Sequence, residues 1–359
     1  MVRLLLARLA GVRFCVRATQ VRWVFDRSDE WFASMEEVKY VNSFAELHEH
    51  IGRNEPCVFQ VPQKYRLPCQ TKWTKEYLTK AVGDKTVMLR SSSSKKYVDP
   101  SQGFGKLVQS MLVSKMTIAD FLETGVQRGM AMSGTDTYLF HKRVANPAWS
   151  KLWEDAKAVT AGDNLTGGVG FLPEGSLHTV GLWLSGAGIK SILHFDDSGN
   201  NNLNFQIGGS KQMVLFPPSD WPQLKTFAAV SLHAMDVYAK LIDSPDQLQQ
   251  LDQLADTHPV FVHLQENDVL YIPSHWYHYV KHEGDFNVNM TCWFAPQASS
   301  TVTGLDEDVS IPKRSCSDWS VIIKMVAAFA VSGLINSCRK IVGGRALVSK
   351  NSTSAKSLI

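Results

Sequence analysis

One histidine stands two residues before an aspartate in the stretch SILHFDDSGN, which begins at residue 191. Successive side chains of a β-strand point to opposite faces, so His194 and Asp196 would lie on the same face of one strand. Two imidazoles and one carboxylate on one side of a metal form the ligand set of mononuclear non-haem iron sites. The chain contains eleven histidines, so this spacing arises by chance about as often as not, and the motif needs a third ligand.

The third ligand is sought among three histidines in NDVLYIPSHWYHYVKH, residues 267–282. His275 falls in a predicted turn and His282 lies beside the next one, so we expect both to be exposed to solvent. His278 stands at the start of a predicted strand, directly after two aromatic residues. We therefore select His278 as the third ligand, and the alternative is a histidine packed in an aromatic core.

Short strands are the elements that would position these residues. From about residue 176, apolar and polar residues alternate in about eight segments separated by turn residues. This pattern predicts an antiparallel β-sandwich or barrel of the jelly-roll type, with a partly helical insertion at about residues 220–259. The segments are HTVGLWLS, SILHFD, LNFQIGG, KQMVLFPP, VFVHL, DVLYIP, YHYVKH and FNVNMTCWF.

Residues 35–170 have a mixed helix and strand pattern. Ser43 and Glu46 form a capping box at the start of the helix predicted in NSFAELHEHI. Helices are also predicted in WTKEYLTKAVGDK and SKMTIADFLETG, and strands in PCVFQVP and KTVMLRS. We expect this α/β region to support a core at residues 175–296.

The composition is that of a globular protein, with 44% hydrophobic and 20% charged residues and a net charge of +3. The basic residues concentrate at the two ends, so the charge is weak evidence that the folded body binds nucleic acid. The six cysteines contain no C-x-x-C pair. We read them as reduced thiols of an intracellular, cytoplasmic protein.

The basic segment at residues 1–30 holds five arginines before its first acid, Asp26. An Arg-rich, acid-free and apolar start is typical of an amphipathic mitochondrial presequence. The alternative, which we favour, is an unstructured start. The segment lacks the long apolar core of a secretory signal.

The C-terminal region, residues 297–359, is basic and contains an apolar helix at about residues 319–337. The apolar run from Trp319 to Ile335 is at the short limit for a membrane span, and Lys324 interrupts it. We therefore favour a helix that packs on the core or pairs two subunits of a homodimer. A tail anchor in a membrane is the alternative.

Taken in order, the stretches LHFD, LNFQIGGSKQMVLFPP, NDVLYIPSHWYHYV and NMTCWF resemble the JmjC-type, cupin-like hydroxylases over about residues 175–296. Members of this family are iron(II) and 2-oxoglutarate dependent dioxygenases on a double-stranded β-helix. The resemblance implies a mainly β fold with an α/β N-terminal part, a jelly-roll core and flanking helices. It also implies Fe(II), 2-oxoglutarate and O2 as metal and co-substrates.

Residue by residue, the resemblance assigns the metal to His194, Asp196 and His278, and the distal carboxylate of 2-oxoglutarate to Lys211. A buried cation suits that carboxylate, and the alternative is a strand lysine that faces solvent. Three further positions match cofactor contacts of the family, and Thr291 stands where the asparaginyl hydroxylase of the group has an asparagine. These three are Ser191, Asn202 and Thr291. Asn200, Asn201 and Asn204 are alternatives to Asn202, and Asn289 lies two residues before Thr291 on the same strand face.

Two departures from the family pattern affect the cofactor contacts. Trp183 stands where many relatives carry a tyrosine or a smaller residue, and the run SGNNN adds two residues after the H-x-D motif. The resemblance implies hydroxylation of a C–H bond, and we favour a protein side chain as substrate because no reader module accompanies the core. A tRNA base is the enzymatic alternative. The sequence is also compatible with a non-catalytic, metal-binding interaction module and with a zinc hydrolase.

Overall fold

The computed structural model describes the polypeptide in nine stretches. The basic segment at residues 1–30 and the expected C-terminal apolar helix lie outside them, as does most of the predicted insertion. Among the described residues, no helix has the length and apolar character needed to cross a membrane. The described residues are 35–91, 114–126, 129–132, 138–141, 144–160, 170–173, 175–196, 200–224 and 256–295.

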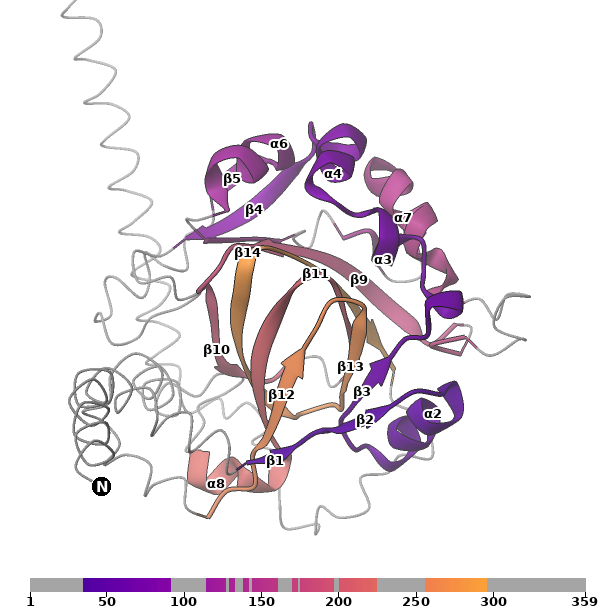
Figure 1. The fold of residues 1–359 in the computed structure, drawn as a ribbon, viewed down its shortest axis with the longest axis vertical. Coiled ribbons are helices and arrows are strands. Elements are labelled where there is room, and N and C mark those ends of the chain that lie inside the picture. Colours follow the sequence, from indigo (N-terminus) through magenta and orange to yellow (C-terminus); the bar gives the residue numbers. More distant parts are fainter. Residues whose placement is uncertain are drawn as a thin grey trace, which may run out of the picture.

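Two long strands, β11 (Asn201–Phe216) and β14 (Tyr277–Phe294), form the centre of the fold (Figure 1). They pair antiparallel from Asn201 with Phe294 to Phe216 with Tyr277, with register shifts on both sides of Gly208. The sequence predicted two shorter strands in place of each of them, so the prediction of four separate strands here was wrong. The glycines that were read as turns bend the strands without ending them.

Each half of this central pair has its own neighbours, so the strands form two halves of a jelly roll. One half has the order β13, β11, β14, β9, and the other has the order β12, β11, β14, β10. This arrangement confirms the predicted jelly-roll core. The outer strands are β9 (Leu177–Ser185), β10 (Lys190–His194), β12 (Val260–Leu264) and β13 (Asp268–Ile272).

The N-terminal region extends both edges of the core. Strands β2 and β3 continue the sheet beyond β13, strands β6, β4 and β5 continue it beyond β9, and β1 pairs with β12. Together the described strands form one 14-stranded sheet. The added strands are β1 (Glu36–Glu37), β2 (Lys39–Val41), β3 (Cys57–Gln60), β4 (Thr86–Ser91), β5 (Ser114–Thr117), β6 (Gly129–Met132), β7 (Phe140–His141) and β8 (Val144–Ala145).

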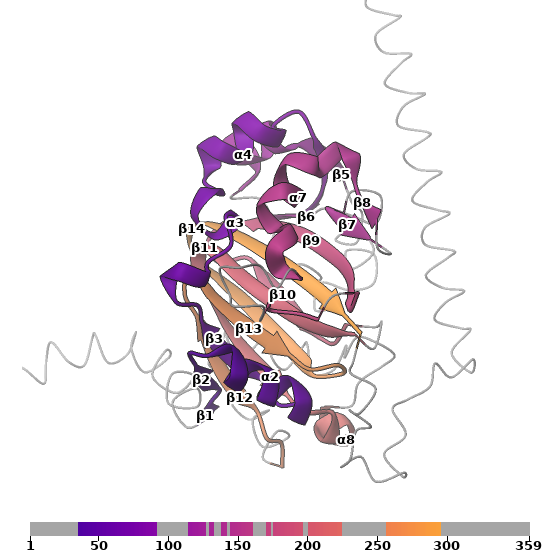
Figure 2. The same ribbon diagram turned by 90° about the vertical axis from the view of Figure 1, so that its right-hand side faces the viewer.

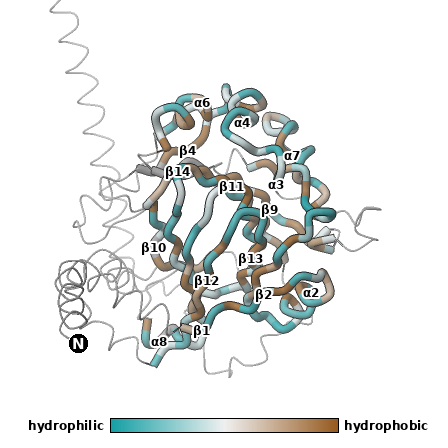
Figure 3. The backbone as a smooth tube through the Cα atoms, viewed as in Figure 1, coloured by the Kyte–Doolittle hydropathy of each residue, from teal (hydrophilic) through white to brown (hydrophobic). Residues whose placement is uncertain are grey.

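Helices pack on the outer face of the half that contains β9, and α3, α4 and α7 lie together there (Figure 2). Helix α2 carries both hydrophilic and hydrophobic residues (Figure 3) and begins at the predicted capping box, where Ser43 Oγ accepts from Glu46 N at 3.2 Å. Short 3-10 turns join the elements at 63–65, 147–149, 157–159 and 218–220. The helices are α2 (Phe44–Arg53), α3 (Cys69–Lys72), α4 (Lys75–Val82), α6 (Ile118–Asp120) with a π-helical turn (Phe121–Gly125), α7 (Ser150–Ala156) and α8 (Trp221–Leu224).

Alternation along the strands separates an apolar outside from a polar inside. On β11, Leu203 and Phe205 belong to the large apolar cluster that the helices cover. Asn202 and Asn204 alternate with them and are also buried, so they point into the jelly roll. Polar side chains of β11 therefore face the inside of this half, where Leu270 and Ile272 of β13 lie opposite them and belong to a smaller, inner apolar cluster. Buried polar side chains beside this cluster mark the interior as a candidate site.

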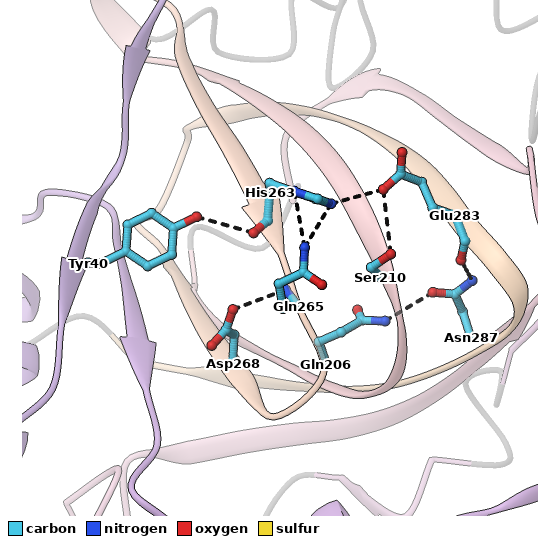
Figure 4. Close-up of polar contacts among 8 residues, drawn as sticks. All are labelled: Tyr40, Gln206, Ser210, His263, Gln265, Asp268, Glu283 and Asn287. Carbon is cyan, nitrogen blue, oxygen red and sulfur yellow. Dashed lines mark hydrogen bonds and ion pairs between the residues drawn. The ribbon is translucent and has the colours of Figure 1, made fainter.

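Gly209 allows β11 to bend between its two halves. Its φ is +73°, and a Cβ built on it would lie 2.6 Å from Phe286 O and from Asn287 Oδ1. Polar contacts close this end of the jelly roll (Figure 4): Gln206 Nε2 donates to Asn287 Oδ1 at 3.0 Å. Glycine is needed here both for its backbone conformation and for the close approach of β14.

We expect Asp155→Ala to lower the free energy of unfolding by about 2–3 kcal/mol, measured by urea denaturation. Asp155 is almost fully buried and accepts hydrogen bonds from Trp73 Nε1 at 3.3 Å and from the Tyr77 hydroxyl, so its loss leaves these donors without an acceptor. Asp84→Ala is the control, because Asp84 is exposed and forms a surface ion pair with Lys85. An equal loss in both variants would contradict this role of Asp155.

Candidate metal centre and co-substrate pocket

The structure brings the three predicted metal ligands together at one end of the jelly roll. His194 ends β10, Asp196 follows two residues later, and His278 lies directly opposite His194 on β14. Their ligand atoms all lie within 4.8 Å of one another. Donor atoms about 2 Å from one ion are about 3–4 Å apart, so small side-chain shifts would enclose a metal. The donor set fits a facial triad that leaves one side of the ion open.

One oxygen of Asp196 is held by two donors. Trp293 Nε1 donates to Asp196 Oδ2 at 2.8 Å, and Asn202 Nδ2 donates to the same oxygen at 3.0 Å. Oδ1 therefore remains as the oxygen that could bind a metal. Burial raises the pKa of Asp196, but His278, His194 and these two hydrogen bonds outweigh burial and lower it below its usual value. Asn202, predicted as a cofactor contact, thus supports a metal ligand.

A backbone hydrogen bond orients His278. Its Nδ1 lies 3.2 Å from Trp276 O, and a ring N–H donating to that carbonyl leaves Nε2 as the ligand atom. Burial, together with the neighbouring His194, lowers the pKa of His278. The ring is therefore neutral at neutral pH, as a metal ligand must be.

The other two histidines of this segment differ from the prediction. His275 is only half-buried, has a φ of 64° and lies outside the ligand group. His282 is buried, with 4% of its surface exposed, so the prediction of an exposed residue was wrong. The reason is that β14 continues through this position instead of ending at it.

Lys211 lies inside the jelly roll. It is 2% exposed, which excludes the alternative of a solvent-facing strand lysine. Its Nζ donates to Asn204 Oδ1, so the side chain reaches from one half of the jelly roll to the other. Burial lowers the pKa of Lys211 to about 7. Within the described part of the chain, no carboxylate forms an ion pair with it.

A network of amides and one hydroxyl positions Asn204. Asn289 Nδ2 donates to Asn204 Oδ1 at 2.6 Å, and Asn204 Nδ2 donates to Thr291 Oγ1 at 3.3 Å. Thr291 Oγ1 in turn donates to Asn289 Oδ1 at 3.2 Å. Thr291 was predicted at the cofactor, and the structure places it one hydrogen bond away from the partner of Lys211. The sequence analysis named Asn204 only as a competitor of Asn202, and Asn289 only as a neighbour of Thr291 on the same strand face; it did not predict their contacts with Lys211 and with each other.

Two further polar groups face the same interior. Ser191 is buried on β10 opposite Val280, which packs with Met213 in the inner apolar cluster. Trp183 Nε1 is buried and has no hydrogen-bond partner among the described residues. A Cβ on Gly181 would lie 3.6 Å from that nitrogen. Trp183 lies opposite Asn289, so its indole N–H is a buried donor on the inner face that lacks an acceptor among the described residues.

The comparison with protein families agrees with this fold. A model described as a cupin-like domain matches residues 43–300, which is most of the chain. The chain belongs to the cupin-like domain family. This result confirms the family predicted from the sequence, and it extends the cupin-like domain to include the α/β region from α2 onwards.

Curated relatives of this cupin-like chain carry two names. It is 29% identical over 265 residues to "tRNA wybutosine-synthesizing protein 4" of Gibberella zeae, covering 71% of this chain and 24% of the relative. It is 26% identical over 261 residues to the protein of that name in Aspergillus fumigatus, covering 67% and 23%. It is 33% identical over 113 residues to "HSPB1-associated protein 1" of Rattus norvegicus, covering 31% and 23%. The chain thus spans about a quarter of the length of these relatives.

We expect Trp293→Phe to weaken metal binding by the cupin-like domain about 10- to 100-fold, the usual effect of removing a hydrogen bond to a ligand. The change keeps an aromatic ring but removes the donor to Asp196 Oδ2. Titration of the apoprotein with Mn(II), followed by electron paramagnetic resonance, measures the dissociation constant. Trp153→Phe is the control, because Trp153 stacks on Phe140 away from the site. Unchanged affinity in Trp293→Phe would show that the Asp196 carboxylate is fixed by other contacts.

Proposed function

We propose that this protein is an iron(II) and 2-oxoglutarate dependent oxygenase that hydroxylates a C–H bond and releases succinate and CO2. The observation that carries the proposal is Lys211: a buried cation with no acidic partner in the described residues, inside the same jelly roll as a two-histidine, one-carboxylate group. Burying a cation without a counter-ion is costly, so the pocket favours an anionic ligand. Membership of the cupin-like family supports the same assignment.

One group of residues would bind the metal, and another would bind the dicarboxylate. His194, Asp196 and His278 would hold the iron, which when bound supplies the activation of oxygen. Lys211 would neutralise the distal carboxylate of 2-oxoglutarate. The Ser191 hydroxyl is a further donor on the inner face. The apolar cluster around Met213 and Val280 limits water inside the jelly roll.

The substrate that we propose is a protein side chain. A tRNA nucleoside is the second candidate, because the relatives that match two thirds or more of this chain are named for wybutosine synthesis on tRNA. Both remain proposals, since the chain spans only about a quarter of those relatives. The third candidate is a non-catalytic metal-binding module. Such a module would form no succinate from 2-oxoglutarate.

The test is succinate formation by purified protein with Fe(II), ascorbate, 2-oxoglutarate and oxygen. We expect turnover that His194→Ala abolishes. Peptide pools and total tRNA are then screened by mass spectrometry for products heavier by about 16 Da, the mass of one oxygen atom. Absence of succinate with every pool, and no difference between wild type and His194→Ala, would support the non-catalytic module. Products only in the tRNA pool would replace the protein substrate by the tRNA substrate.

A further inference from the structure

His282 is a buried base that the proposed metal centre does not use. It lies on β14, two alternations beyond His278, and directly opposite Lys211 on β11. Residues directly opposite each other on antiparallel strands point to the same face, with Cβ atoms about 5 Å apart. Both side chains are almost fully buried, so both point into the jelly roll. The two bases therefore share one part of the interior.

The imidazole of His282 has no protein partner at one of its ring nitrogens. Its Nδ1 is buried and makes no hydrogen bond with any described residue. Buried polar nitrogens almost always have a partner, and leaving one without a partner is costly. Burial, and then the charge of Lys211, lowers the pKa of His282 to about 3. A neutral imidazole keeps one N–H donor at physiological pH.

Lys211 restricts what that partner can be. Lys211 Nζ donates to Asn204 Oδ1 and makes no hydrogen bond with His282 Nδ1. An ammonium group only donates hydrogen bonds, so it also cannot accept one from an N–H at that nitrogen. An anion placed beside both side chains would accept from the ammonium and from the imidazole together. A carboxylate has two oxygens that each accept hydrogen bonds, so it can accept one from Lys211 and one from His282 at the same time.

We propose that His282 and Lys211 form a two-base clamp for the distal carboxylate of the co-substrate, with His282 as a residue that determines specificity for a dicarboxylic 2-oxo acid. This inference rests on the proposed function. Lys211 supplies the charge and a hydrogen bond to one oxygen. His282 donates a hydrogen bond to the other oxygen and fixes the position of that carboxylate on β14.

The test compares two ligands that differ in the distal carboxylate. Binding of 2-oxoglutarate and of 2-oxobutyrate to the Mn(II)-loaded full chain is measured by calorimetry without oxygen. We expect His282→Ala to reduce the preference for 2-oxoglutarate about tenfold, which corresponds to about 1.4 kcal/mol, and to leave 2-oxobutyrate binding unchanged. His282→Asn, which retains a donor, should recover part of the preference. His263→Asn is the matched control, since His263 lies opposite Gln212 and is half-exposed.

A second measurement does not depend on a variant folding. With ¹⁵N-labelled histidine, the ring nitrogens of His282 in the wild-type protein should shift when 2-oxoglutarate is added, and not when 2-oxobutyrate is added. An unchanged preference in His282→Ala, or no shift with 2-oxoglutarate bound, would overturn the clamp and leave His282 hydrogen-bonded to water only. Failure of the wild-type protein to bind Mn(II) or 2-oxoglutarate would instead overturn the proposed function.

Discussion

Replacing His278 with alanine is expected to abolish stoichiometric iron binding and to lower 2-oxoglutarate turnover by more than about 100-fold. Residues that merely support a ligand change metal affinity or activity by about 10- to 100-fold, and His278 is itself a proposed ligand. Its ring lies 4.2 Å from that of His194, between centroids, and its tautomer is fixed by Trp276 O. The two remaining ligands, His194 and Asp196, come from one short segment and leave the ion open on most sides.

The measurement is metal content after anaerobic reconstitution with Fe(II), together with succinate formation. His263→Ala is the control: this histidine lies on the half-exposed face of β12, where it contacts Glu283 at 3.0 Å (Figure 4). The His263→Ala variant should retain the iron content and the rate of succinate formation of the wild-type protein. If His278→Ala kept one iron per chain, the metal would have to bind outside the His194, Asp196 and His278 group.

The affinity for 2-oxoglutarate is expected to fall at least about 30-fold in Lys211→Met, and to depend on pH in the wild-type protein. Removing one partner of a buried charge pair costs about 2–5 kcal/mol, which corresponds to roughly 30- to 5,000-fold. Methionine fills a similar volume and carries no charge. Lys281→Met is the control, because Lys281 is adjacent to His282 on β14 and so points to the opposite face.

The sign of the pH effect follows from the pKa of Lys211, which burial lowers to about 7. Below pH 7 the lysine is charged and ready to bind a carboxylate. Above pH 7 it is neutral, so binding must take up one proton, and the apparent affinity should fall about tenfold from pH 6 to pH 8. His282 and His278, which face it from β14, have lowered pKa values and do not titrate there. Calorimetry in buffers of different ionisation enthalpy measures the proton uptake, and no uptake at pH 8 would contradict this assignment.

The strands of the core were predictable because alternation of apolar and polar residues is a local property. It was not predictable that β11 and β14 are each one continuous strand. The pairs Gly208–Gly209 and Glu283–Gly284 have the composition of turns, and only the partner strand shows that the ladder continues past them with a bulge. The helices at Ser43 and Thr117 were found because their caps are also local.

The metal ligands were predictable from one short motif and from the family resemblance, and the structure brings their ligand atoms together. The contacts around Lys211 were not predictable. Asn204, Asn289 and His282 acquire their roles from the register in which β11 pairs with β14, and no local pattern specifies that register. The exposure of His282 was predicted wrongly for the same reason.

The full-length pairing of β11 with β14 also bears on how the protein folds. Every contact of this ladder joins residues far apart in the sequence, from Asn201 with Phe294 to Phe216 with Tyr277. Closing such long loops before any pairing is gained makes folding slow, as in other proteins of high contact order. Lys211 and His278 lie on these two strands, so neither the proposed metal site nor the proposed anion site can be complete before the strands pair. A chain interrupted before β14 would hold His194 and Asp196 but no site.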